Sequence, residues 1–154
     1  MPLTKPELDF VFGLQARLGD MLVVGETPEG LRRMIPIVDG TFTGPKLHGR
    51  VLGGGADWQF VRNDGVTVAE ATYLLRTDDG VPIQVRNRGV RHGPQDVIRR
   101  LTEGDEVDPA EYYFRTSPSF LVPAGPYDWL NRDVFVATGA RYAKAIELWF
   151  YRVT

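Results

Sequence analysis

Turn signals recur along the whole chain and constrain its fold more than any other feature. They stand at Asp39-Gly40, Gly53–Gly55, Asp64-Gly65, Asp79-Gly80 and Gly125-Pro126. Glycine tolerates positive φ, and a preceding aspartate supports local turn hydrogen bonds. With 17 Gly and 11 Pro among 154 residues, the chain carries too many helix breakers for a helical bundle. The pattern predicts many short strands joined by tight turns.

The runs between these turns are rich in Val, Ile, Thr, Phe and Tyr, which favour strands. We expect strands over residues 8–18, 40–52, 56–62, 66–77, 82–89, 112–122, 133–140 and 143–153. Helix is expected over residues 93–101 and as a single turn at 109–111, while 18–32 fits a loop or a strand. About eight strands in one domain, residues 1–154, make an antiparallel barrel or a sandwich, and closure into a barrel removes the strand edges.

Composition and motifs exclude several classes of chemistry. The formal charge of −2 gives no basic excess for nucleic acid or an anionic membrane, and there is no Cys. His48 and His92 lack metal-ligand spacing, Gly53–Gly55 is not a phosphate loop, and Ser117 and Ser119 stand in no nucleophile elbow. We therefore expect neither a metal nor a cofactor. With no apolar run long enough for a membrane span and no signal segment, the expected location is the cytoplasm.

Four segments carry a resemblance to a known family. They are GPKLHGRVLGGGADWQ at residues 44–59, RTDDG at 76–80, YFRTSP at 113–118 and YDWLNRDVF at 127–135. In this order and spacing the chain resembles the domain-of-unknown-function 3237 family, from about residue 30 to its C-terminus. The resemblance implies a lipocalin-like β-barrel and no established activity. The chain departs from the family pattern at Gly53, where Pro is common, and at Thr72, where Arg is usual, so a role for an arginine at position 72 does not carry over.

Asp57 is the first candidate for chemistry. It follows three glycines, which allow close backbone approach, and precedes Trp58, which can line a ligand site. A carboxylate partly desolvated by an aromatic ring has a raised pKa and becomes a usable general base. The alternative is that Asp57 caps a turn and accepts backbone hydrogen bonds.

Two further carboxylates lie within apolar strands. Glu70 alternates with Val68 and Leu74, and both faces of that strand are apolar enough to be covered. Glu147 alternates with Ala145 and Trp149 in the last strand. Each carboxylate either pairs with an arginine or lysine in a structural ion pair, or faces a cavity, Glu70 as an acid or base and Glu147 as a ligand contact.

Arg115 and two tyrosines are candidates for binding an oxyanion. Inside a barrel, the Arg115 guanidinium can bind a carboxylate or stabilise an enolate, or instead form a buried ion pair with Asp57 or Glu70. Tyr73 and Tyr113 can donate their phenol hydroxyls to a carbonyl oxygen, or can be ordinary core tyrosines with satisfied hydroxyls.

The segment after Gly125-Pro126 has the character of a short lid or plug at one barrel end. Trp129 is expected to pack across the mouth, and Asn131 to hydrogen-bond a ligand. Structural plugging alone explains the tryptophan equally well.

Three functions remain open on these residues. The first is a cofactor-free isomerase, hydratase or cyclase, in which Asp57 or Glu70 moves a proton on a small apolar or aromatic metabolite. The second is a carrier or sensor that binds such a metabolite unchanged, and the third is a structural subunit with a filled barrel.

The sequence also predicts surface features. A homo-oligomer is expected because apolar residues of the last strand, Ile146, Leu148 and Phe150, are interpreted as exposed. The cluster of arginines at positions 86, 88, 91, 99 and 100 is interpreted as a solvated face.

Overall fold

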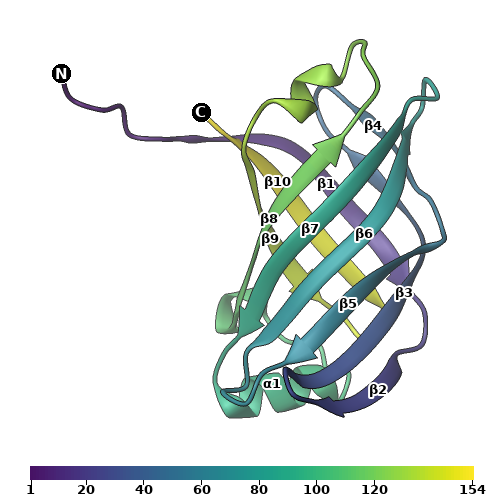
Figure 1. The fold of residues 1–154 in the computed structure, drawn as a ribbon, viewed down its shortest axis with the longest axis vertical. Coiled ribbons are helices and arrows are strands. Elements are labelled where there is room, and N and C mark those ends of the chain that lie inside the picture. The colour runs from purple at the N-terminus through teal and green to yellow at the C-terminus, as the bar shows by residue number, and fades with distance from the viewer.

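A computed structural model describes residues 1–154 and contains ten strands and one α-helix (Figure 1). Short 3₁₀ turns η1 (Pro109–Glu111) and η2 (Asp128–Asn131) complete it. The other elements are β1 (Leu8–Leu18), β2 (Leu22–Thr27), β3 (Gly30–Thr43), β4 (His48–Val51), β5 (Gly55–Val61), β6 (Thr67–Thr77), β7 (Pro82–His92), α1 (Gln95–Thr102), β8 (Tyr113–Leu121), β9 (Phe135–Arg141) and β10 (Ala145–Val153).

The sheet closes on itself into an eight-stranded antiparallel barrel, which decides between the barrel and the sandwich and confirms the fold that the family resemblance implies. Neighbouring strands follow chain order from β5 through β10, and β1 returns to pair with both β10 and β3. The β1–β3 ladder therefore removes the two edges that an open sandwich would leave. The hairpin strand β2 pairs with β3 alone.

Several strand boundaries differ from the prediction. The stretch expected as one strand over residues 40–52 is divided between β3 and β4, and the ambiguous residues 18–32 contain β2 and the start of β3. Strands β7 and β9 run on to His92 and Arg141, beyond their predicted ends at residues 89 and 140. These extensions matter because they carry two arginines into the barrel wall.

Aromatic side chains fill the half of the barrel interior that lies far from α1. Phe12 stacks on Phe150 with ring centroids 4.4 Å apart, and Phe120 meets Phe135 edge to face at 4.9 Å. All four are buried. This half of the barrel is a solid core.

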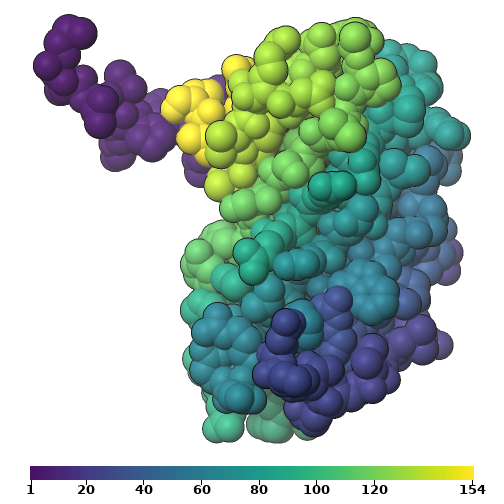
Figure 2. All heavy atoms as spheres, viewed as in Figure 1, coloured from purple at the N-terminus to yellow at the C-terminus, as the bar shows by residue number.

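The two barrel ends are covered differently (Figure 1). Turn η2 lies over one end and buries Leu130, while α1 lies over the other and buries Val97. No helix is long and apolar enough to cross a membrane. Residues 1–6 extend away from the barrel as an exposed arm, purple in Figure 2.

Candidate functional site

A cavity of about 40 Å³ lies inside the barrel, on the α1 side of the aromatic core. That volume holds roughly three water molecules. Hydrophobic side chains make up 11 of its 16 lining residues. The polar and charged members are Asp57, Asn87, Arg91, Thr116 and Arg141, with the phenol of Tyr73 beside them.

Strand register brings these polar side chains together. Asp57 of β5 pairs with Ala71 of β6, and Ala71 pairs with Asn87 of β7, so the three lie at one level across adjacent strands. Thr116 of β8 lies beside β7 opposite Gly89. The small alanine and glycine leave room between the polar groups, as interior cavities require.

Gln59 orients the Asp57 carboxylate. The Nε of Arg33 donates to Gln59 Oε1 at 2.8 Å, and Gln59 Nε2 donates to Asp57 Oδ2 at 2.7 Å. Because the Gln59 side chain must accept through its oxygen and donate through its nitrogen, its amide can adopt one orientation only. Asp57 Oδ2 is thereby held, and its second oxygen, Oδ1, is left for the cavity.

Four buried oxygen atoms that line this cavity have no hydrogen-bond partner. They are Asp57 Oδ1, Tyr73 Oη, Asn87 Oδ1 and Thr116 Oγ1. Buried polar groups in proteins are nearly always paired, and an unpaired one costs roughly 1–3 kcal/mol. These four atoms come from four different strands and border the same cavity.

Burial raises the pKa of Asp57, and this effect outweighs the hydrogen bond from Gln59 and the charges of Arg91, Arg141 and Arg33, which all lower it. Burial likewise raises the pKa of Tyr73, with a further contribution from Asp57. The phenol of Tyr73 therefore stays protonated at neutral pH and remains a hydrogen-bond donor.

Glycine at position 55 makes room for Tyr73. A Cβ at this position would lie 2.5 Å from the Cβ of Tyr73 and 2.7 Å from the carbonyl oxygen of Thr72. The preceding residue, Gly54, has a φ of 97°, which favours glycine. The glycine run thus lets β5 approach β6 beside Asp57, in agreement with the close backbone approach expected from the sequence.

A second hollow of about 390 Å³ lies between the barrel end and α1, and we call it the α1 basin. It shares Arg91 and Arg141 with the inner cavity and adds Arg33. Residues Ile98 and Leu101 of α1 form part of its wall. The basin and the cavity together make a site whose two parts meet at the arginines.

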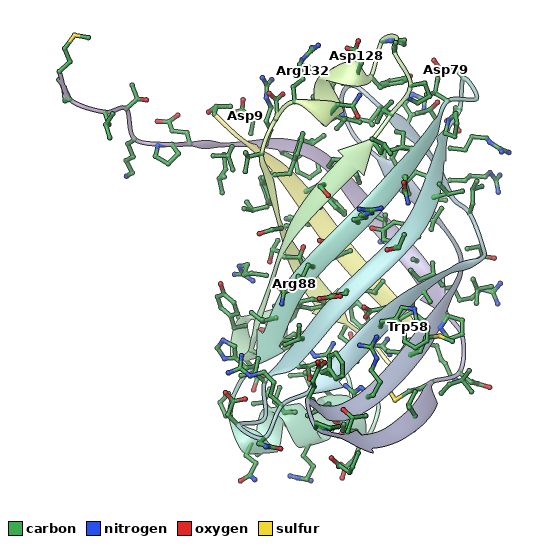
Figure 3. All side chains as sticks on the ribbon, viewed as in Figure 1. Asp9, Trp58, Asp79, Arg88, Asp128 and Arg132 are labelled. Atoms are coloured by element: carbon green, nitrogen blue, oxygen red, sulfur yellow. The ribbon has the colours of Figure 1, made fainter.

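Two of the predicted site residues on β5 and β6, Trp58 and Glu70, face away from the cavity. Trp58 follows Asp57 along β5, so its side chain points to the opposite face and lies on the outer surface of the barrel (Figure 3). The guanidinium of Arg32 lies over the indole, 5.0 Å from the ring centroid of Trp58. Glu70 is exposed and accepts a 2.9 Å hydrogen bond from Arg88 Nε. The outer face of β6 is solvated, so the expectation that both of its faces are covered is wrong.

Arg115 and Tyr113 also lie on the outside of the barrel. The Arg115 guanidinium stands 5.3 Å from the ring centroid of Tyr113, which itself stacks on His92 at 4.8 Å. Arg115 pairs with neither Asp57 nor Glu70; it donates to the carbonyl oxygen of Phe114. Both predictions of an interior position are corrected, because inward residues of β8 fall at even numbers.

The last strand has the opposite orientation to the one expected. Glu147 lies on the outer face, where its Oε1 accepts a 3.0 Å hydrogen bond from Trp149 Nε1. Ile146 lines the cavity, and Leu148 and Phe150 are buried in the barrel. The prediction that Glu147 faces the cavity is therefore wrong. The prediction that Ile146, Leu148 and Phe150 are exposed is also wrong, so these side chains give no support to a homo-oligomer.

Trp129 and Asn131 sit on η2, at the end of the barrel opposite α1. Trp129 packs against Phe135 and covers that end, so the expectation of a plug is met. Asn131 uses both of its amide groups on the backbone of Val122, at 2.8 and 2.9 Å. Both of its polar groups thus serve the backbone, and neither Trp129 nor Asn131 reaches the cavity.

Six polar residues of the site were not predicted from the sequence: Arg33, Gln59, Asn87, Arg91, Thr116 and Arg141. Arg91 and Arg141 fall just past the predicted strand ends, and Arg33 lies where no strand is expected. Continuing the alternation of Val85 and Asn87 to residue 91 would have placed Arg91 inside. The cluster interpreted as one solvated face is therefore divided, with Arg91 buried at 9% exposure.

The two histidines play no part in this site. His48 contacts Asp78 at the surface, and His92 stacks on Tyr113. No group of three or more His, Cys, Asp or Glu side chains is arranged to hold a metal ion.

Together, the fold and the site define a closed β-barrel protein with a largely apolar cavity at one end, bordered by arginines and holding a few polar side chains. The chain belongs to the DUF3237 family, described as proteins of unknown function, whose model matches residues 6–153. This confirms the resemblance seen in the sequence.

Individual relatives agree with this assignment. The UPF0311 protein RPA1785 of Rhodopseudomonas palustris is 40% identical over 147 residues, which cover 96% of each chain. Its crystal structure superposes with a TM-score of 0.95, over 99% of this chain and 100% of that one. A β-barrel-like protein of Acinetobacter baumannii is 36% identical, with a TM-score of 0.87 over 99% of both chains.

A more distant likeness extends to a fungal protein. A structure described as an enzyme from Penicillium herquei matches with a TM-score of 0.74 at 20% identity, over 100% of this chain and 98% of that one. At this identity the likeness shows a shared fold and carries no residue roles.

Proposed function

We propose that this protein is a cofactor-independent acid–base enzyme that acts on a small, partly apolar metabolite at the α1 end of the barrel. The observation that supports the proposal is the convergence of Asp57 Oδ1 with three other unpaired buried oxygens on one cavity. Each unpaired buried polar group in a native protein calls for an explanation, and functional sites are where proteins are expected to break such rules.

Asp57 serves as the general base. Gln59 holds Oδ2, so Oδ1 is the oxygen that accepts a proton from a carbon next to a carbonyl, or from a hydroxyl. The raised pKa of Asp57 brings its basicity closer to neutral pH. Because the inner cavity is small, only the reacting end of the substrate enters it, and the remainder lies in the α1 basin.

Tyr73 stabilises the oxygen on which negative charge develops. Its hydroxyl is buried, unpaired and next to Asp57, so it can donate a hydrogen bond to a carbonyl oxygen without giving up another partner. Return of the proton to a different atom gives an isomerase; loss or addition of water, or ring closure, gives a lyase or cyclase. All three need one base and one oxyanion donor.

The test follows protons by ¹H NMR in D₂O. The wild-type protein is incubated with a panel of short oxo acids, enones and hydroxyaromatic compounds, and exchange or conversion is monitored. Asp57→Asn should abolish the reaction without lowering Tm, and Tyr73→Phe should slow it by roughly 100-fold. Glu70→Gln, an exposed carboxylate on the next strand, is the matched control and should react at the wild-type rate.

Two outcomes would overturn the proposal. If every compound that binds is recovered unchanged and unexchanged, the protein is a carrier, which is the alternative function. If Asp57→Asn keeps the wild-type rate, another group is the base.

A further inference from the structure

The structure leads us to propose a substrate class: the ligand of this site is an organic carboxylate, whose anionic group is held between Arg33, Arg91 and Arg141 where the cavity meets the α1 basin. The inference rests on the proposed function in placing the ligand at this end of the barrel. It adds the chemistry that selects the ligand.

The residue that most directly indicates an anionic ligand is Arg91. Its side chain is 9% exposed and projects from β7 into both hollows. Its guanidinium lies 5.5 Å from the ring centroid of Phe114, has no hydrogen-bond partner and forms no ion pair. A buried charge is normally paired, so an unpaired one facing a cavity is expected to have an anion as its partner.

The other two arginines are held in place beside it. Arg33 is fixed through its Nε on Gln59, and Arg141 through one terminal nitrogen on the carbonyl oxygens of Tyr142 and Ala145. Each keeps further N–H groups free. A guanidinium fixed by one edge presents the rest of its planar fork to a carboxylate, and pre-organised forks of this kind bind that group in bidentate fashion.

The local charge is unbalanced without a ligand. Three arginines face one carboxylate, Asp57, which stands within reach of their charges. The other acidic residue that borders the basin, Glu103, is paired with Arg99 on its own helix at 3.5 Å. Lys144 also borders the basin and adds to the positive potential, although it is paired with Asp20. The excess of positive charge favours an anion.

The apolar lining favours an organic carboxylate over inorganic phosphate. Behind the arginines most of the inner cavity is lined by apolar side chains, such as those of Leu14, Ile37 and Ile146, which offer a phosphate no donors. A short carbon chain attached to a carboxylate can fill this space, and the apolar surface of the chain is then removed from water. The arginines then fix the carboxylate, and the adjoining carbon lies toward Asp57.

Butyrate, butyramide and inorganic phosphate are the probes. Calorimetric titration and Tm shifts should show binding of butyrate and neither of the other two. Arg91→Met should weaken butyrate binding by roughly 30-fold or more, as loss of a buried charge partner does. Arg86→Met is the matched control, since Arg86 is exposed on the outer face of the same strand. Arg33→Met is the second variant and should also weaken binding.

The Asp57→Asn variant separates this inference from the proposed function. Removing the carboxylate leaves the arginines, so butyrate should bind at least as tightly as to wild type. Carboxylate binding that depends on Arg91, with no turnover of any compound, supports the inference and ends the proposed function. If the protein turns over a carboxylate and the KM is unchanged in both Arg91→Met and Arg33→Met, the proposed function stands and the inference about the arginines is overturned. The inference is overturned if butyramide binds as well as butyrate, or if phosphate binds as tightly as butyrate through Arg91.

Discussion

Replacing Arg91 by Met should stabilise the empty protein while it weakens ligand binding. Burial, with Arg141 and Arg33 adding repulsion, lowers the pKa of Arg91 from its ordinary value to about 10. Since one pKa unit corresponds to about 1.4 kcal/mol, holding this guanidinium charged at neutral pH costs about 3 kcal/mol. Asp57 offsets part of that repulsion and is already included in the lowered pKa.

Methionine keeps the length of the side chain and removes the charge. The variant loses the contact between the guanidinium and Phe114, which is worth about 1 kcal/mol. The net expectation is a gain of about 2 kcal/mol, or about 4–8 °C in Tm for a chain of this size. Because the folded-state pKa is the lowered one, the gain is constant through neutral pH and shrinks only as the pH rises through about 10.

Urea unfolding at pH 7, followed by circular dichroism, measures this directly. Arg86→Met, on the outer face of the same strand, should change the unfolding free energy by less than about 0.5 kcal/mol. A loss of more than about 1 kcal/mol in Arg91→Met would refute the reasoning, because it would show that Arg91 is a structural support. A gain in stability together with a loss of butyrate binding is the combination expected of a functional residue.

Four further substitutions test the assignment of the site. Burial raises the pKa of Asp57, so its ionised form opposes folding. That cost is absent below the unfolded pKa, grows as the pH rises above it, and levels off above the raised folded pKa; the Tm advantage of Asp57→Asn over wild type should therefore widen as the pH rises above about 4 in calorimetric scans. Asn131→Ala removes two hydrogen bonds to the backbone of Val122 and should lower the free energy of unfolding in urea by about 1–3 kcal/mol with turnover unchanged. A drop in turnover at an equal folded fraction would show that Asn131 belongs to the functional site. Glu70→Gln breaks an exposed ion pair and should cost under about 1 kcal/mol, whereas complete loss of turnover would contradict its outward position. Gly55→Ala forces its Cβ against Tyr73 and should destabilise by about 1–3 kcal/mol and slow turnover; wild-type values of both would contradict the close packing of β5 on β6.

Local sequence patterns were enough to predict the class of fold and two residues of the site. Turn residues at regular intervals and β-rich runs between them predict the barrel strands, because backbone φ limits and side-chain branching act locally. Asp57 and Tyr73 were both predicted, and the structure places them together on one cavity. Their roles in catalysis stay predictions.

Which face of each strand points inward was decided by the tertiary structure. A period of two separates Glu147 from Leu148 but does not say which of them is inside when both faces carry apolar side chains. Closure of β1 on β3 and β10 settles this for the last strand and sends Ile146, Leu148 and Phe150 into the barrel. The face that holds Glu147 is left to solvent.

The arginines depended on tertiary structure for the same reason. In the sequence Arg91 belongs to a basic cluster, and composition favours solvent for such a group. Three more residues of strand at the end of β7 carry it into the barrel wall, where it lies beside Arg33 and Arg141 from strands far apart in the chain. Local propensity fixes each strand, but only closure of the barrel brings these three like charges together at the α1 basin.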